Sequence, residues 1–147
     1  MAPGTRVAAG ADEISSVEAA MALFCTDSIS LCCTNVQLAK QWWIGTFDCK
    51  EMRVPPDWDC QLPSDVALTL RGTDEPAILL CDRDEVQRAR YERLNERPII
   101  FCTNLKKAHE YLHGRGGAVG PIQDAGGTQF FELRDLEGNT IEICEEP

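Results

Sequence analysis

The sequence predicts an α+β fold built from two copies of one β-α-β-β-β unit. The main observation is an internal repeat, because LCCTNVQLAKQWW (31–43) and IFCTNLKKAHEYL (100–112) align without a gap. In both copies a strand-like run ends at Thr-Asn, and apolar residues then recur at helical spacing. The second observation is that three strand-like runs follow each predicted helix. With 147 residues, the chain is long enough for one domain with a hydrophobic core and short for two.

The elements follow in order along the chain. Residues 1–25 are predicted to be an N-terminal extension, with a disordered Ala/Gly start and a short helix in VEAAMALF that Ser15–Glu18 would cap. A single domain covers 26–147, with modules 26–82 and 97–147 joined by a polar linker, 83–96, that can be partly helical. Thr34–Asn35 and Thr103–Asn104 provide N-cap side chains for the two main helices. The later strands are predicted at FDCKEMRV (47–54), DVALTLRG (65–72) and PAILLCD (76–82), then at AVGPIQ (118–123), TQFFELRD (128–135) and NTIEIC (139–144).

Composition excludes several classes of protein. The net charge of −10 argues against nucleic-acid binding, which needs a basic surface, while an acidic surface is compatible with a cationic small molecule. No run approaches the roughly 20 apolar residues that span a bilayer, so no membrane partner is expected. The eight cysteines contain no C-x-x-C pair, and most lie in apolar strand-like runs. We therefore expect a cytoplasmic protein with reduced thiols.

The segment HEYLH (109–113) matches the H-E-x-x-H pattern of zinc hydrolases. His109 and His113 lie one position beyond the apolar stripe of the second predicted helix, on its outer flank. Val119 stands where the longer version of the motif has its third histidine, and Glu132 is in the middle of a predicted strand. A zinc hydrolase therefore remains only a remote alternative.

The two units, together with the closing segment FFELRDLEGNTIEICE (130–145), resemble the vicinal oxygen chelate superfamily. This group contains glyoxalase I, bleomycin-resistance proteins and extradiol dioxygenases. The resemblance implies two modules whose strands curve into a cup, with helices on the convex side and a ligand site in the concavity. It also implies a homodimer whose cups are shared between subunits.

The resemblance places the family's four metal-ligand positions at Ser28, Leu79, Arg97 and Glu142. Only Glu142 is a type of residue that binds a metal, and an arginine stays protonated. The sequence therefore contradicts glyoxalase-type octahedral chemistry and the two-histidine iron site of the dioxygenases. We expect no metal and no other cofactor.

Strand alternation then predicts which side chains face the cup. Arg97 and Glu142 would either bind a ligand together or form a structural ion pair in the position of the lost metal. Trp58, in a proline-rich loop, would either cover the cup or fold back onto the edge of the domain. The predicted ligand-binding residues are Ser28, Ser30, Leu79, Arg97, Phe101, Thr140, Glu142 and Trp58, and the cup-facing set also includes Cys32, Ala77, Cys81, Ile99 and Cys144.

Three functions fit this pattern. The leading hypothesis is metal-independent binding of a small organic molecule, with a cationic or amphipathic ligand favoured by the acidic charge. The second is an enzyme, a lyase, isomerase or dioxygenase-like protein, with Glu142 as general base and Arg97 and Ser28 orienting an oxyanion. The third is a scaffold that binds a partner through its N-terminal helix. The sequence leaves open whether the chain catalyses a reaction.

Overall fold

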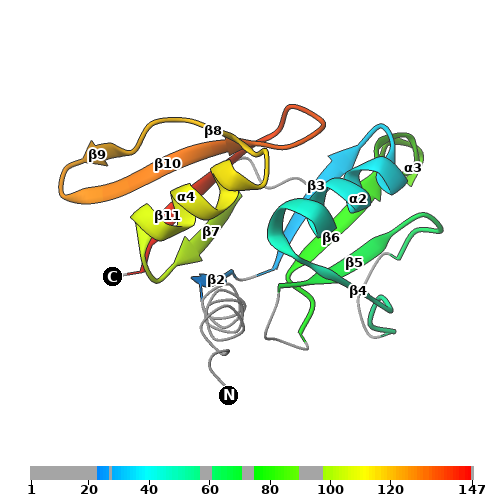
Figure 1. The fold of residues 1–147 in the computed structure, drawn as a ribbon. Helices are drawn as coiled ribbons and strands as arrows, with labels where there is room; N and C mark the ends of the chain where they lie inside the picture. Colours follow the sequence, from blue (N-terminus) through cyan, green and yellow to red (C-terminus); the bar gives the residue numbers. More distant parts are fainter. Residues whose placement is uncertain (1–22, 27, 57–60, 71–74, 90–97, 147) are drawn as a thin grey trace, which may run out of the picture.

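The computed structural model describes residues 23–26, 28–56, 61–70, 75–89 and 98–146 (Figure 1). Trp58, Arg97 and all but the end of the predicted N-terminal helix lie outside this part of the chain. No helix in the described ranges has the length and apolar character needed to cross a membrane.

The first module follows the predicted order β-α-β-β-β. Its elements are β3 (Ile29–Cys33), α2 (Val36–Phe47), β4 (Lys50–Met52), β5 (Val66–Thr69) and β6 (Ile78–Asp82). The sheet order is β3-β6-β5-β4, in which β3 and β6 are parallel and the other pairs are antiparallel.

The second module repeats this arrangement. Its elements are β7 (Ile99–Cys102), α4 (Leu105–Gly114), β8 (Ala118–Val119), β9 (Gln123–Ala125), β10 (Thr128–Arg134) and β11 (Thr140–Glu145). The order β7-β11-β10-β8 matches the first sheet, again with one parallel pair, β7 and β11. Figure 1 shows α2 and α4 on the same side of their sheets. The α+β class and the two repeated modules are therefore confirmed.

The predicted helix caps form as expected. Asn35 Oδ1 accepts a hydrogen bond from Leu38 N at 3.1 Å, and Asn104 Oδ1 accepts one from Lys107 N at 3.0 Å. Each bond satisfies a backbone N–H that has no partner within the helix. The aligned Thr-Asn pairs thus start the two helices in the same way.

Two boundaries differ from the prediction. Helix α2 continues to Phe47 and ends at Asp48 with φ 59, so the strand expected over 47–54 is reduced to β4. Gly120 and Pro121 divide the strand expected over 118–123 into β8 and β9, because proline cannot donate a ladder hydrogen bond. In the linker, 83–96, a short helix forms, α3 (Arg83–Ala89), in agreement with the expectation of a partly helical segment.

The last residues of the predicted N-terminal extension form a strand. Strand β2 (Phe24–Cys25) pairs antiparallel with β7, at the edge of the second sheet. Thr26 Oγ1 donates to Ile99 O at 2.7 Å, and Thr103 N donates to Leu23 O at 3.1 Å. The chain therefore contributes a strand to the second module before it enters the first.

The helical sides of both sheets share one hydrophobic core. Phe24 is buried at the junction of the modules, with its ring 5.1 Å from that of Phe47 in α2 and 5.8 Å from that of Tyr111 in α4. Trp43 stacks on Phe47 at 4.9 Å and is fully buried. One side chain from β2 thus joins the helices of both modules.

Glu137 provides a polar connection between the modules. It lies in the turn between β10 and β11, and its carboxylate accepts hydrogen bonds of 2.8–3.2 Å from Thr34 N, Thr34 Oγ1 and Asn35 N at the start of α2. Burial opposes ionisation, but these hydrogen bonds and the charge of Arg83 outweigh it and lower the pKa of Glu137 below its ordinary value of 4.5. The negative charge also suits the positive end of the helix dipole.

We expect Glu137→Gln to reduce the free energy of unfolding by about 1 kcal/mol, the usual value of a helix cap at this level of exposure. Since the folded pKa is lowered, the contribution of Glu137 is fully present well above pH 4.5 and is lost as the pH falls through the lower folded value. Urea unfolding of both proteins at several pH values measures this, with Glu110→Gln on the exposed face of α4 as control. A difference between wild type and Glu137→Gln that stays constant into strong acid would contradict the assignment.

Candidate functional site

The two sheets present different surfaces on the side opposite α2 and α4. In the first module, five buried residues form a second hydrophobic cluster there: Cys32, Ala67, Leu79, Cys81 and Val86. Val86 comes from α3, and Met52, Val54 and Leu62 pack against the same cluster. This side of the first sheet is therefore occupied by the chain itself.

The equivalent surface of the second module is accessible, and we call it the open face. It consists of the side chains of β7, β10 and β11 that point away from α4: Ile99, Phe101, Phe130, Glu132, Arg134, Thr140, Glu142 and Cys144. The alternating neighbours Ile100, Phe131, Leu133, Ile141 and Ile143 are fully buried under α4. The predicted alternation of β7 and β11 therefore agrees with the observed burial.

An apolar row crosses the open face. The strand registers pair Cys25 with Phe101, Phe101 with Cys144, and Cys144 with Phe130, so these four side chains lie side by side across β2, β7, β11 and β10. Phe101 and Phe130 are each half-buried. Their partly uncovered rings give a ligand an apolar surface to contact.

A carboxylate pair lies directly beside this row. Glu132 and Glu142 are opposite each other in the antiparallel register of β10 and β11. Like charges at such positions repel each other and destabilise a sheet. The pair therefore favours positive charge nearby, which Arg134 on the same face or a cationic ligand can supply.

Glu142 also interacts with the apolar row. The thiol of Cys144 donates to Glu142 Oε1 at 3.1 Å. Burial, followed by the hydrogen bond and the charge of Glu142, raises the pKa of Cys144 to about 12, so the thiol stays protonated and is a poor nucleophile. Cysteine-based covalent catalysis on this face is thus disfavoured.

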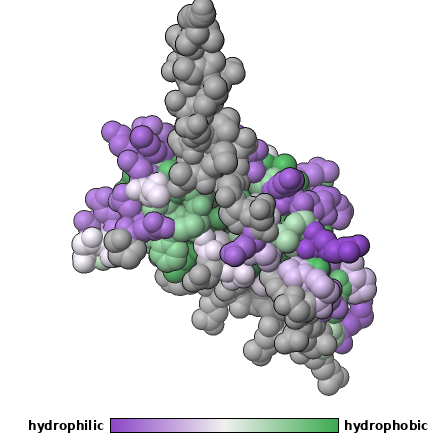
Figure 2. All heavy atoms as spheres, turned by 90° about the horizontal axis from the view of Figure 1, so that it is seen from below, coloured by the Kyte–Doolittle hydropathy of each residue, from purple (hydrophilic) through white to green (hydrophobic). Residues whose placement is uncertain are grey.

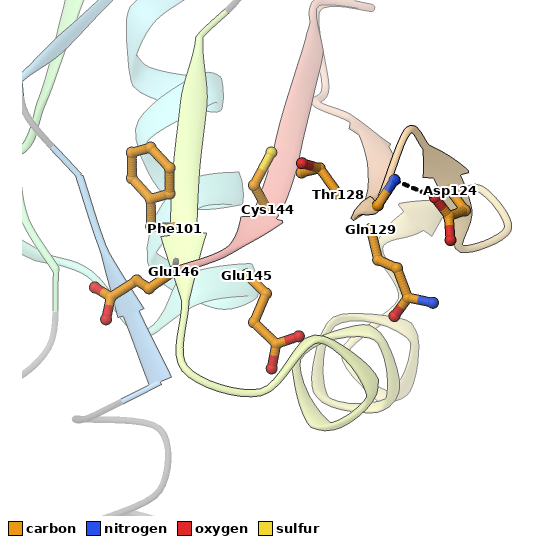
Figure 3. Close-up of a pocket in the computed structure, with 8 residues that line it drawn as sticks. Phe101, Asp124, Thr128, Gln129, Cys144, Glu145 and Glu146 are labelled. Atoms are coloured by element: carbon orange, nitrogen blue, oxygen red, sulfur yellow. Dashed lines mark hydrogen bonds between the residues drawn. The ribbon is translucent and has the colours of Figure 1, made fainter.

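A cavity of about 570 Å³ lies at one end of the open face, between β7, the end of β11 and the β9–β10 hairpin. Its size falls within the usual range for small-molecule sites. The lining residues are Phe101, Asp124, Gly127, Thr128, Gln129, Cys144, Glu145 and Glu146. Figure 3 shows Phe101 and Cys144 between Glu146 at one end and Asp124 at the other.

The predicted site residues fall into separate groups. Phe101, Thr140 and Glu142 lie on the open face, with Phe101 also in the cavity wall. Leu79 is packed in the second cluster and is only 7% exposed, while Ser30 is its half-buried register partner. Ser28 is exposed, and its hydroxyl donates to Pro76 O at 3.2 Å. Leu79 is therefore buried in the first module, whereas Phe101, Thr140 and Glu142 lie on the open face of the second.

The main residues that sequence reasoning missed are Asp124, Glu145 and Glu146 in the cavity and Glu132 on the open face. Applying the same alternation to β10 would have identified Phe130 and Glu132. No comparable pattern marks Asp124, since it comes from a hairpin whose position depends on the break at Gly120 and Pro121.

The histidines of HEYLH lie on α4, on the opposite side of the second sheet from the open face. His109 Nε2 donates to Gly120 O at 2.8 Å, and its ring packs edge-on against Phe131 at 4.9 Å. His109 is thus nearer the core than the predicted outer flank, whereas His113 is exposed. The bond to Gly120 occupies one ring nitrogen in a structural role. In the described ranges, no group of three or more His, Cys, Asp and Glu side chains is arranged to hold a metal ion.

Figure 2 shows the molecule from below in the orientation of Figure 1. Hydrophobic side chains gather on the left, where the second module lies, and hydrophilic side chains border them. Apolar surface with a polar border is typical of a binding region.

Comparison with solved structures identifies the fold. A glyoxalase/bleomycin resistance protein/dioxygenase superfamily member from Sphaerobacter thermophilus is 15% identical, with a TM-score of 0.60 over 83% of this chain and 97% of that one. A lactoylglutathione lyase from Agrobacterium tumefaciens is 15% identical, with a TM-score of 0.61 over 82% and 92%. TnmS3, an antibiotic binding protein from Streptomyces sp. CB03234, is 15% identical, with a TM-score of 0.60 over 84% and 96%.

No protein-family model matches the sequence, and no curated protein is significantly similar to it. The structural likeness therefore establishes that this chain has the fold of the glyoxalase/bleomycin-resistance/dioxygenase superfamily. The predicted resemblance is confirmed at the level of the fold.

Proposed function

We propose that the chain binds a small organic molecule on the open face of its second module, without a metal ion. The observation that carries this proposal is the partly exposed apolar row of Phe101 and Phe130 beside the carboxylates of Glu132 and Glu142. A mainly apolar surface with a few polar groups is the usual composition of a small-molecule site. The antibiotic-binding description of TnmS3, which has the same fold, is consistent with this function.

Metal independence is supported by the residues at the family's ligand positions. Leu79 has no donor atom, and the neutral hydroxyl of Ser28 is not among the usual ligands of a divalent ion. Glu142 alone gives a divalent ion too few donors. A ligand would therefore be held by direct contacts with the protein.

A cationic ligand and a homodimer are further parts of the proposal. The net charge of −10 and the opposed pair Glu132–Glu142 both favour positive charge in the ligand. Because no described segment packs over the open face, a second copy of the chain can supply the other wall of the predicted cup. Light scattering should then give about twice the 16.3 kDa mass of one chain.

The proposal is tested with metal-stripped protein and a panel of small cationic, neutral and anionic organic molecules. Hits from thermal shift are measured by calorimetry, since a ligand that binds the folded state raises its stability. Phe101→Ala should weaken a confirmed hit by at least about tenfold, as expected for loss of a central aromatic contact. Leu38→Ala, an exposed change on α2, is the control.

Two results would contradict this function. One is binding that appears only after a metal ion is restored, and the other is binding that Phe101→Ala leaves unchanged. The enzyme hypothesis predicts in addition that a hit is converted to product and that Glu142→Gln abolishes the conversion. Binding without product formation favours the binding protein.

A further inference from the structure

The cavity at the end of the open face has an arrangement of charge that the proposed function does not use. Asp124, Glu145 and Glu146 contribute carboxylates, and no lysine or arginine of the described ranges lines the cavity. Among the described residues these three carboxylates form no ion pair. Within this part of the chain, no neighbouring side chain therefore neutralises the negative potential in the cavity.

Two of the carboxylates are held in place by the protein. Asp124 Oδ1 accepts a hydrogen bond from Gly127 N at 2.9 Å in the turn of the β9–β10 hairpin. Glu146 Oε1 accepts one from the thiol of Cys25 at 2.6 Å, which connects it to β2. Each bond uses one oxygen, so each carboxylate keeps a second oxygen for a ligand. Fixed acceptors lose less conformational entropy on binding than mobile ones.

The lining between these carboxylates is mixed, because Thr128, Gln129 and Glu145 add polar groups beside two apolar side chains. The ring of Phe101 and the protonated thiol of Cys144 form its apolar wall, with Asp124 at one end and Glu146 at the other (Figure 3). An aromatic ring also attracts a nearby cation through its π face. Phe101 and Cys144 thus provide an apolar contact surface between two acidic groups, Asp124 and Glu146.

We infer that this cavity binds an organic diamine: a compact apolar body lies against Phe101 and Cys144, and its two ammonium groups reach Asp124 and Glu146. The inference rests on the proposed function, since it assigns a ligand class to the same face. It goes further by requiring two positive charges, placed at opposite ends of the molecule. A molecule with a single positive charge would contact only one of the two carboxylates, and a neutral ring would contact only the apolar wall.

Four probes with the same ring test this directly: p-xylylenediamine, benzylamine, benzyl alcohol and benzoate. Titrations are followed by ¹H–¹⁵N NMR shifts and calorimetry, at low and high salt. The diamine should bind about tenfold more tightly than benzylamine, as expected for one additional charge-assisted contact, and benzyl alcohol should bind more weakly still. Benzoate should not bind, and salt should weaken the diamine most.

Asp124→Asn and Glu146→Gln are the matched variants, because both keep a carbonyl oxygen for the internal hydrogen bond. Each variant should bind the diamine about tenfold more weakly than wild type does, with an affinity close to that of wild type for benzylamine. Glu110→Gln, on the exposed face of α4, should leave it unchanged. Thermal unfolding of all variants verifies that the fold is retained.

The two proposals fail in different ways. Equal affinities for the diamine and benzyl alcohol, no binding of the diamine, or no effect of Asp124→Asn and Glu146→Gln would each overturn the diamine inference. If Phe101→Ala still abolished binding of a neutral molecule, the proposed function would stand without the diamine inference. If the wild-type protein binds neither the diamine nor any molecule of the panel, both proposals are contradicted.

Discussion

Phe24→Ala is expected to lower the free energy of unfolding by about 3–5 kcal/mol, the usual range for truncating a buried phenylalanine. The effect should be at the upper part of this range, because Phe24 contacts the aromatic rings of both Phe47 and Tyr111. These contacts join α2 to α4, so the two modules should lose cooperativity as well as stability. Urea unfolding followed by tryptophan fluorescence, with Trp42 and Trp43 in the first module, and by NMR signals of the second module measures both effects.

Leu38→Ala is the control for this truncation, since Leu38 is 50% exposed and should change stability by no more than about 0.5 kcal/mol. A loss of less than about 1 kcal/mol for Phe24→Ala, with one cooperative transition in both probes, would contradict the role given to Phe24 at the junction.

Asp135→Ala is expected to cost about 2–4 kcal/mol, because it leaves several backbone and side-chain donors without an acceptor. The buried Asp135 carboxylate accepts from Glu137 N at 3.0 Å, Asn139 N at 2.8 Å and Asn139 Nδ2 at 3.0 Å. It thereby fixes the turn that carries Glu137 to the start of α2. Chemical denaturation measures the loss.

Two further variants separate hydrogen bonding from other effects. Asp135→Asn keeps an acceptor for the backbone donors but places an amide N–H₂ against Asn139 Nδ2, so it should cost about half as much as Asp135→Ala. Asp124→Ala removes a single hydrogen bond, in the exposed β9–β10 hairpin, and should lower the free energy of unfolding by less than about 1 kcal/mol. Equal losses for Asp135→Ala and Asp124→Ala would show that the Asp135 network does not stabilise the fold.

Much of the fold could be predicted because both modules carry the same local signals. The Cys-Thr-Asn segments end a buried strand and cap a helix in each copy, and the apolar spacing that follows matches the buried positions Val36, Ala39 and Trp43. The strands predicted over 128–135 and 139–144 leave a short connection between them, and there Gly138 has φ 83, which would strain a non-glycine residue.

The candidate site was harder to predict, because it depends on differences between modules that share one pattern. Leu79 and Thr140 both alternate toward the same side of their sheets, yet Leu79 is buried by Val86 and Met52, whereas Thr140 is exposed. That difference comes from the linker helix α3, which packs onto the first sheet, and strand alternation carries no information about it. Long-range packing, rather than local periodicity, decides which face stays open.

Locating a bound molecule tests the proposed open-face site directly. Metal-stripped, ¹⁵N-labelled protein is titrated with the tightest hit from the ligand panel, and the amide shifts are mapped onto the two sheets. A site on the open face should give the largest shifts at Phe101, Phe130, Glu142 and Cys144, with the first-module positions Ser30 and Leu79 nearly unaffected. Shifts centred on Leu79 or on His109 and His113, or binding that requires an added metal ion, would contradict a metal-independent site on the open face.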